Sequence, residues 1–360
     1  MKKVAFFVNH ELVIYNFRKE IVKKFLDENY DVYIISPKGK KIDLLIELGA
    51  KHIDIDIDRH GINPLKDIYI IKKIKKILRN LQPDYLFTFT IKPNIYGSYA
   101  AKKLKIPHSA NITGLGTAVE KPGLLQKITL IMYKVSFSNI NTVFFQNEDN
   151  LNFFRKYKIA LNKHILLPGS GVNLEEFSLE EYPNNDVIKF AFISRIMKEK
   201  GIDQFLDVAS RMKNEKKAEF HVYGFCEDSY ENKLKILTEE GIINYHGMTD
   251  NVKEVLKKID CLIHPTYYPE GISNILLESL AIGRPIITTN RPGCKEVVDD
   301  GINGYMIEPE SSNMLFDSVQ KFLSLDKKER SLMGINGRKK VEAYFDRKIV
   351  VEKYLEEVKK

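Results

Sequence analysis

The stretch YPEGISNILLESLAIGRP, residues 268–285, follows the apolar run CLIHP at 261–265. The run has the length and composition of a buried strand, and ILLESLAIG has those of a helix that stops at Gly283. Ser273 or Asn274 is expected to cap the N-terminus of this helix. A glycine turn that joins the carboxyl end of a strand to a helix indicates a βα unit of an open parallel sheet.

The same alternation of short apolar runs and amphipathic helices continues along the whole chain of 360 residues. This length exceeds that at which one hydrophobic core usually stops growing, so two domains are expected. We predict an α/β fold with two doubly wound, Rossmann-like domains that face a cleft. The expected strands are 4–8, 32–35, 85–89, 142–145, 165–167, 190–193, 220–223, 261–264 and 286–289.

The polar segment SLEEYPNNDV at 178–187 resembles a linker. We therefore predict a first domain at 1–175, a second at 176–344, and a C-terminal helix at 345–360 that packs back on the first domain.

Composition excludes several classes of protein. Hydrophobic residues make up 44% and charged residues 29%, which is typical of a folded globular chain. The three cysteines are widely spaced and favour a reducing cytoplasm over a disulfide framework or a zinc site. Neither a signal-peptide core nor a run of about 20 apolar residues is found.

The formal net charge of +8 indicates an anionic partner. IIKKIKKILRN at 70–80 predicts a lysine-rich helix, and PGLLQKITLIMYKVSF at 122–137 predicts an apolar one. The first could equally be a solvated helix and the second a core helix. Because no nucleic-acid-binding motif accompanies the charge, we favour an anionic membrane surface over nucleic acid.

Two carboxylates, Glu270 and Glu278, flank the start of the helix after 271. The first turn of a helix offers unpaired N–H donors and a positive dipole end to an anion. Ionised carboxylates accept strongly from hydroxyls, so acids beside an anion site suit a polyhydroxylated group that carries phosphate. Alternatively, one of the two glutamates is simply a solvent-facing helix residue.

Cations and glycines are also expected at the ends of other strands. Arg195 ends one strand and Lys200 precedes the next helix, a pair that could neutralise a diphosphate, although surface cations at a helix start are also common. VYGFCED at 222–228 and NYHGMTDN at 244–251 place glycines where backbone could approach a flat base.

These residues carry a resemblance to a known family. The patterns S-R-x-x-x-x-K-G, H-G-x-x-x-x-V and E-x7-E resemble the donor domain of retaining glycosyltransferases of family four, which have the GT-B fold. The resemblance extends through RPIITTNRPGCKEVVDDGINGYMIEP. In the first domain, YNFRKEIVKKF, TIKPNIYG and NITGLG resemble the bacterial subgroup that extends lipid-linked oligosaccharides for capsule, O-antigen or protein glycosylation.

The resemblance implies a transfer of a hexose-type sugar from a nucleotide sugar, with UDP favoured, to a polyprenyl-diphosphate-linked saccharide. It implies that Glu278 binds ribose, that Glu270 contacts the donor sugar, and that Arg195 and Lys200 hold the diphosphate. Other donor-binding positions would be Gly271, Ile272, Ser273, Asn274, Leu276, Gly224, His246 and Gly247.

No metal or other cofactor is expected, because fixed cations and a helix terminus would compensate the charge. DIDID at 54–58 resembles a metal-binding D-x-D, but we interpret it as a polar strand edge. The expected location is the cytoplasm, at the inner face of the cell membrane.

The acceptor side is less well marked. Many members of the family have a histidine where this chain has Thr113-Gly114-Leu115-Gly116. The acceptor-side candidates are His10, Asn16, Arg18, Lys92, Thr113 and Gly114. Two alternatives remain: a non-hydrolysing UDP-N-acetylhexosamine epimerase, which would carry further paired acids and a histidine, and a non-catalytic nucleotide-sugar-binding module at the membrane surface.

Overall fold

A computed structural model of the chain describes residues 1–57, 64–116, 119, 122–226 and 228–360. The chain forms two compact units. The first comprises Met1–Ser170, Pro269–Gly271 and Arg347–Lys360, and the second comprises Gly171–Tyr268 and Ile272–Asp346. The main division therefore falls after residue 170, whereas the sequence placed it after 175. Each unit is a parallel sheet covered by helices, and the predicted fold class is confirmed.

The sheet of the first unit has the strand order β3-β2-β1-β4-β5-β6-β7, and all its described pairs are parallel. The central register pairs Phe6 of β1 with Ile34 of β2 on one side and Phe87 of β4 on the other. The strands are β1 (Lys3–Phe7), β2 (Asp31–Ser36), β3 (Lys51–Asp54), β4 (Tyr85–Phe89), β5 (His108–Ile112), β6 (Thr142–Phe145) and β7 (His164–Leu166).

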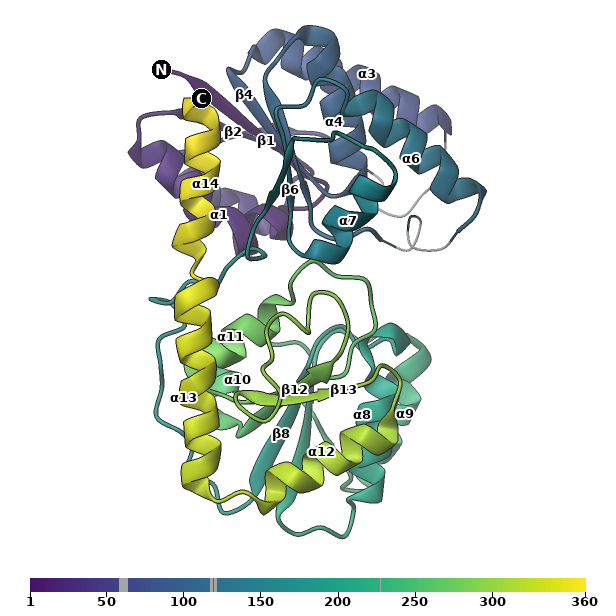
Figure 1. Cartoon of the computed structure of the whole chain (residues 1–360), viewed down its shortest axis with the longest axis vertical. Helices are drawn as coiled ribbons and strands as arrows, with labels where there is room; N and C mark the ends of the chain where they lie inside the picture. Colours follow the sequence, from purple (N-terminus) through teal and green to yellow (C-terminus); the bar gives the residue numbers. More distant parts are fainter. Residues whose placement is uncertain (58–63, 117–118, 120–121, 227) are drawn as a thin grey trace. The chain divides into compact units, whose positions relative to one another are not determined.

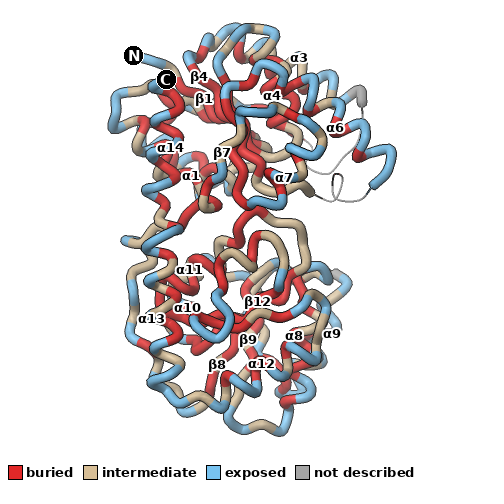
Figure 2. Tube along the Cα trace, viewed as in Figure 1, coloured by how far each residue is buried: buried red, intermediate tan, exposed pale blue. Residues whose placement is uncertain are grey.

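Helices cover both faces of this sheet (Figure 1). One face packs on α3 (Pro64–Leu81), α4 (Ile91–Leu104) and α6 (Leu124–Ser136). The other packs on α1 (Glu11–Asp27), α2 (Lys40–Glu47) and α14 (Arg347–Lys359), while α7 (Glu148–Lys156) follows β6. The central strands β1, β4, β5 and β6 are buried almost throughout, and the edge strands β3 and β7 are exposed or half-buried. The helices alternate between buried and exposed residues (Figure 2). This alternation is the 3.6-residue period from which the helices were predicted.

The C-terminal helix α14 belongs to the core of the first unit. The ring of Tyr354 stacks on Phe144, with 4.9 Å between ring centroids, and its hydroxyl oxygen accepts from Asn111 Nδ2 at 2.6 Å. Glu357, which is buried, accepts from the hydroxyls of Tyr85 and Thr142 at 3.0 and 2.7 Å. Aromatic stacking and paired buried polar groups together explain why the end of the chain folds onto the first unit, as predicted.

The second unit repeats the architecture with the strand order β10-β9-β8-β11-β12-β13, again parallel. Its strands are β8 (Ile188–Ile193), β9 (Ala218–Tyr223), β10 (Asn244–Tyr245), β11 (Cys261–His264), β12 (Ile286–Thr289) and β13 (Gly304–Ile307). One face packs on α8 (Ile202–Arg211), α9 (Glu231–Glu239) and α12 (Ser312–Ser324). The other packs on α10 (Val252–Lys258), α11 (Asn274–Ile282) and α13 (Lys327–Tyr344).

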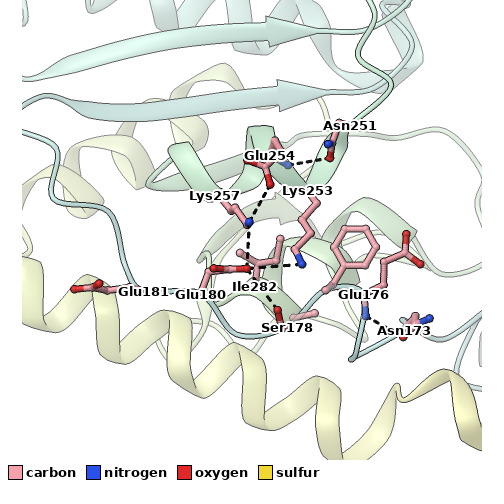
Figure 3. A network of polar contacts seen from close by, with 12 residues as sticks. Asn173, Glu176, Ser178, Glu180, Glu181, Asn251, Lys253, Glu254, Lys257 and Ile282 are labelled. Carbon is pink, nitrogen blue, oxygen red and sulfur yellow. Dashed lines mark hydrogen bonds and ion pairs between the residues drawn. The ribbon is translucent and has the colours of Figure 1, made fainter.

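The expected linker is tied to the second unit rather than loose. The carboxylate of Glu180 lies between Lys253 and Lys257 of α10, at 3.7 and 3.4 Å, and its backbone N–H donates to Ile282 at the end of α11 (Figure 3). Arg284, only 1% exposed, donates to carbonyl oxygens of the linker, of α10 and of the end of α11. Burial lowers the pKa of Arg284 to about 10, so it remains charged at neutral pH.

Replacement of Tyr354 by alanine should destabilise the first unit by roughly 3–5 kcal/mol, because it empties a buried aromatic site and leaves the Asn111 amide without its acceptor. Tyr344→Ala is the control, since that side chain is 66% exposed. Urea denaturation would measure both. A Tyr354→Ala protein as stable as the Tyr344→Ala protein would contradict the role given to α14.

Candidate active site

Each unit has a point at which the order of its strands reverses. In the second unit this point lies between the neighbours β8 and β11, and in the first unit between β1 and β4. Ligands of open α/β sheets bind beyond the carboxyl ends of strands at such a point. Arg195 follows β8, and the segment that contains Tyr268 follows β11. The sequence therefore places the predicted donor residues at the switch point of the second unit.

Backbone contacts fix the two loops of this switch point to each other. The carbonyl oxygen of Glu199, in the loop after β8, accepts from Tyr267 N–H at 2.9 Å and from Thr266 Oγ1 at 3.2 Å. Gly201 has a φ of +79°, and a Cβ there would meet the carbonyl oxygen of Pro265. Only glycine meets both requirements without strain, so the loop after β8 is held against the end of β11.

The two predicted cations share one aromatic ring. Arg195 Cζ lies 5.4 Å and Lys200 Nζ lies 5.0 Å from the ring centroid of Tyr268. Lys200 is only 7% exposed, and burial, with a further contribution from Arg195, lowers its pKa to about 7. The ring quadrupole stabilises both cations, but the crowded positive charge favours an anion between or beside them.

The N-terminus of α11 is the second electropositive element. The N-cap is Ser273, but its side chain makes no capping bond, since Oγ lies 3.1 Å from His264 Nε2 instead. The backbone N–H of Ser273 donates to the carbonyl oxygen of Gly293 at 2.9 Å. The helix stops at Gly283, in the left-handed conformation, as predicted. The first-turn N–H groups thus receive no side-chain cap and are suited to an anionic ligand.

The sequence reasoning missed His264 and Tyr268. His264 is 1% exposed, and burial together with the nearby Lys200 keeps its pKa well below the usual value, so the imidazole is neutral. It orients the Ser273 hydroxyl and adds no charge. Tyr268 opens the stretch that decided the fold, and its position directly before Pro269 and Glu270 was the available signal.

The two glutamates are half-buried and belong to different units. Glu278 lies in the second turn of α11, in the second unit. Glu270 belongs with Pro269 and Gly271 to the first unit, although Tyr268 and Ile272 on either side belong to the second. Ile272 and Leu276 are buried, and Asn274 opens the helix.

The predicted base-binding glycines come together after β9 and β10. Gly224 N–H donates to the carbonyl of Gly247 at 2.8 Å, and a Cβ on Gly224 would meet the carbonyl of Ser194, directly before Arg195. His246 stacks on Tyr223 with 4.4 Å between centroids and an interplanar angle of 9°. Burial lowers the pKa of His246, so this flat surface is neutral. A planar, neutral group beside a cationic one matches a nucleoside diphosphate.

The acceptor-side candidates occupy varied positions in the first unit. His10 and Lys92 follow β1 and β4 at its switch point; His10 Nδ1 accepts from Leu12 N–H at 3.1 Å, and Lys92 forms an ion pair with Asp67 at 3.3 Å. Thr113 and Gly114 follow β5 and contact residues 269–271.

The remaining two lie on α1. Arg18 is only 1% exposed, its guanidinium lies 5.2 Å from the Phe89 ring centroid, and burial lowers its pKa. Asn16 is exposed, and its carbonyl accepts from Arg347 at 3.4 Å. Arg18 is thus a core residue, a position that the sequence pattern did not predict.

Within the residues that the structure describes, no group of three or more His, Cys, Asp or Glu side chains could hold a metal ion. Strand β3 ends at Asp54, whose Oδ1 accepts from Lys38 N–H at 3.1 Å. Asp54 thus lies in the edge strand of the sheet, whereas Asp56 follows the strand. Asp58 lies outside the described residues.

Comparison with known proteins gives concordant results. Residues 175–340 match the glycosyl transferases group 1, and residues 3–147 match the glycosyl transferase 4-like family. A relative in Campylobacter jejuni, an N,N'-diacetylbacillosaminyl-diphospho-undecaprenol alpha-1,3-N-acetylgalactosaminyltransferase, is 27% identical, with 98% of this chain and 97% of the relative covered.

Two solved structures share the fold. A glycosyltransferase from Rickettsia africae has a TM-score of 0.82 at 19% identity, with 99% of this chain and 98% of that chain covered. HepE of Anabaena, solved in complex with UDP, has a TM-score of 0.81 at 14% identity, with 99% of both chains covered.

The fold and the site therefore define a glycosyltransferase with GT-B architecture. The chain belongs to glycosyltransferase family four.

Proposed function

We propose that this glycosyltransferase moves a hexose-type sugar from a UDP-linked donor to a polyprenyl-diphosphate-linked saccharide in the synthesis of a bacterial surface polysaccharide or glycan. The Campylobacter relative is named for a diphospho-undecaprenol acceptor, and HepE was solved with UDP. The similarity covers nearly the whole of this chain, of the Campylobacter relative and of HepE. This coverage supports a UDP-linked donor and a polyprenyl-diphosphate-linked acceptor for this chain.

The observation that carries the proposal is the pair of cations at the second unit's switch point. Arg195 and Lys200 both face Tyr268, in a loop that is hydrogen-bonded to the end of β11. The leaving UDP of a glycosyl transfer gains negative charge as its bond to the sugar breaks. Fixed donors that meet this charge stabilise the transition state without reorganisation. Glu278 is assigned to the ribose hydroxyls, and Glu270 to those of the sugar.

The same arrangement supports a mechanism without a metal. Two side-chain cations and the N-terminus of α11 supply the positive charge that a divalent ion would otherwise bring. The resemblance to the family implies attack on the same face of the sugar as the leaving group. The acceptor hydroxyl then bonds to the anomeric carbon, the sugar–phosphate bond breaks, and the leaving phosphate oxygen takes the hydroxyl proton, so the configuration is retained.

The binding of UDP should weaken above neutral pH because of Lys200. A bound diphosphate favours the charged ammonium, whose pKa in the ligand-free protein is lowered to about 7. Affinity should therefore be full below this pKa and fall as the pH rises above it, by at most about tenfold per pH unit. Calorimetric titration from about pH 6 to pH 9 would measure this. Lys200→Arg, which stays charged, should flatten the profile, and an equally steep profile in both proteins would contradict the assignment.

Substitution of the two glutamates should affect different steps. Glu278→Gln should weaken UDP itself by roughly tenfold or more, because a charge-assisted bond to a ribose hydroxyl becomes a neutral one. Glu270→Gln should leave the affinity for UDP unchanged and lower kcat. Titration with free UDP and measurement of turnover separate the two effects. If Glu278→Gln binds UDP as the wild type does, Glu278 does not bind ribose.

The proposed acceptor is anchored in a bilayer, so the enzyme must reach a membrane surface. In the described residues, no helix is long and apolar enough to cross a bilayer. Helix α6, which contributes to the core, also has an apolar exposed face. It exposes Leu124, Ile128, Ile131 and Val135, at 75%, 46%, 60% and 46%, while it buries polar side chains, among them Gln126, whose Nε2 donates to Val119. An exposed apolar stripe on a helix suits the boundary between headgroups and acyl chains.

Helix α3 supplies basic charge near the same face of the first unit. Both α3 and α6 pack on α4 (Figure 1). Ile70, Ile74 and Leu78 of α3 are buried in the core of the first unit. The lysines at 72, 73, 75 and 76 alternate with these core positions and are exposed or half-buried. Each basic residue near an anionic leaflet contributes about 1 kcal/mol. We therefore assign α3 and α6 to the inner face of the cell membrane.

Co-sedimentation with vesicles tests this surface. Anionic vesicles should bind the protein in a salt-sensitive manner, and neutral vesicles should bind it weakly. Changing Lys72, Lys73, Lys75 and Lys76 to glutamine should weaken the salt-sensitive part. Changing the α6 residues Ile128 and Ile131 to serine should weaken the part of vesicle binding that does not depend on salt.

Ile236→Ser and Leu332→Ser, at 53% and 56% exposed positions of the second unit, are the matched controls. Turnover of a short acceptor without a lipid should persist in every variant. Binding that ignores both lipid charge and the α3 and α6 substitutions would refute the assignment.

A further inference from the structure

The segment that carries Glu270 is held by one side chain of the first unit. Asn147 follows β6, and its Nδ2 donates to the backbone carbonyl of Glu270 at 3.1 Å and to that of Gly271 at 2.9 Å. All three residues belong to the first unit, and the asparagine is 1% exposed. Two hydrogen bonds from one buried amide fix the position of two successive peptide groups.

The other end of the same amide is also fixed. Asn147 is the N-cap of α7, and its Oδ1 accepts from Asn150 N–H at 2.9 Å (Figure 1 shows α7 after β6). An N-cap bond orients the plane of the amide, so Nδ2 has a defined direction. The helix thus determines the orientation of the group that holds the carbonyls of Glu270 and Gly271.

A second buried amide encloses the segment. Gln146 is 4% exposed, and a Cβ on Gly271 would meet its Oε1 as well as the carbonyl oxygen of Thr113. Nε2 of Gln146 lies 3.4 Å from Asn111 Oδ1, and the amide of Asn111 donates to Tyr354 of α14. Because these amides are buried and connected, the segment is packed against a rigid part of the first unit.

We propose that Asn147 is a positioning residue for Glu270 in sugar transfer. This inference rests on the proposed role of Glu270 at the donor sugar. In this role Asn147 acts by fixing the backbone from which the carboxylate extends. A displacement of about 1 Å in a reacting group can lower turnover about a hundredfold, so loss of the two hydrogen bonds should lower kcat rather than the affinity for UDP.

The test separates this role from the helix cap. Asn147→Asp and Asn147→Ser both keep a side-chain oxygen that can cap α7. Aspartate, however, places a carboxylate against two carbonyl oxygens, and serine is too short to reach both of them. We expect kcat to fall roughly 10- to 100-fold in Asn147→Asp, and less in Asn147→Ser. The Kd of free UDP should stay within about twofold of wild type, because Arg195, Glu278 and the α11 terminus are unchanged.

The control is Asp326→Asn at the N-cap of α13, where Oδ1 accepts from Glu329 N–H at 2.8 Å. It makes the reverse chemical change at a helix cap outside the candidate site, and kcat should be unchanged. Midpoints of thermal unfolding for all variants show whether the proteins remain folded. Should Asn147→Asp unfold, Asn147→Ser provides the comparison of kcat with Kd.

Wild-type kcat in both Asn147 variants would overturn the proposal. So would a loss of UDP affinity that parallels the loss of kcat, because that result indicates general damage to the site. The Glu270→Gln variant distinguishes a failure of the role proposed for Glu270 from a failure of the positioning role proposed for Asn147. If it has full activity, the proposed role of Glu270 fails, and the positioning role fails with it. If Glu270→Gln is impaired and the Asn147 variants are active, only the positioning role is wrong.

Discussion

The site depends on the reversal of strand order between β8 and β11. Because these neighbours send their connections to opposite sides of the sheet, the space beyond their carboxyl ends is not covered by a crossover. The loop after β8 brings Arg195 and Lys200 there, and the connection after β11 brings Tyr268 and the N-terminus of α11. Thr266 and Tyr267 donate hydrogen bonds to the carbonyl oxygen of Glu199 and so hold the two loops together. The two cations therefore meet the Tyr268 ring, although cations and ring come from loops that follow different strands.

This arrangement keeps cationic side chains in a buried place, where desolvation disfavours their charged forms. Lys200 is almost fully buried beside Arg195, and the lowered pKa of Lys200 measures the cost of keeping the ammonium charged. The ring of Tyr268 offsets part of that cost, while His264 stays neutral and adds no further positive charge. Strongly perturbed groups of this kind cluster at functional sites, because an anionic ligand recovers the unfavourable energy on binding.

The sequence predicted the parts of the structure that repeat. Apolar runs identified β1, β4, β8 and β11, and the glycine turn before 274 identified the start of α11. It missed β5, whose sequence HSANI carries three polar residues, because the buried Asn111 is paired with Tyr354, a partner 243 positions away. It missed β13, which begins at Gly304, where a Cβ would meet the carbonyl of Ile286. That Glu270 and Glu278 of one motif belong to different units, and that Arg18 is buried, depends on such distant contacts, which local patterns do not encode.

We propose that fixed protein charges at the β8 and β11 switch point compensate the negative charge of the leaving diphosphate. The test is transfer from an α-linked UDP-sugar to a polyprenyl-diphosphate-linked saccharide in excess EDTA, with the product analysed by NMR. We expect undiminished turnover and an α-linked product, together with a loss of roughly a hundredfold or more in Arg195→Ala. Activity that disappears in EDTA and returns with magnesium, or a β-linked product, would contradict it.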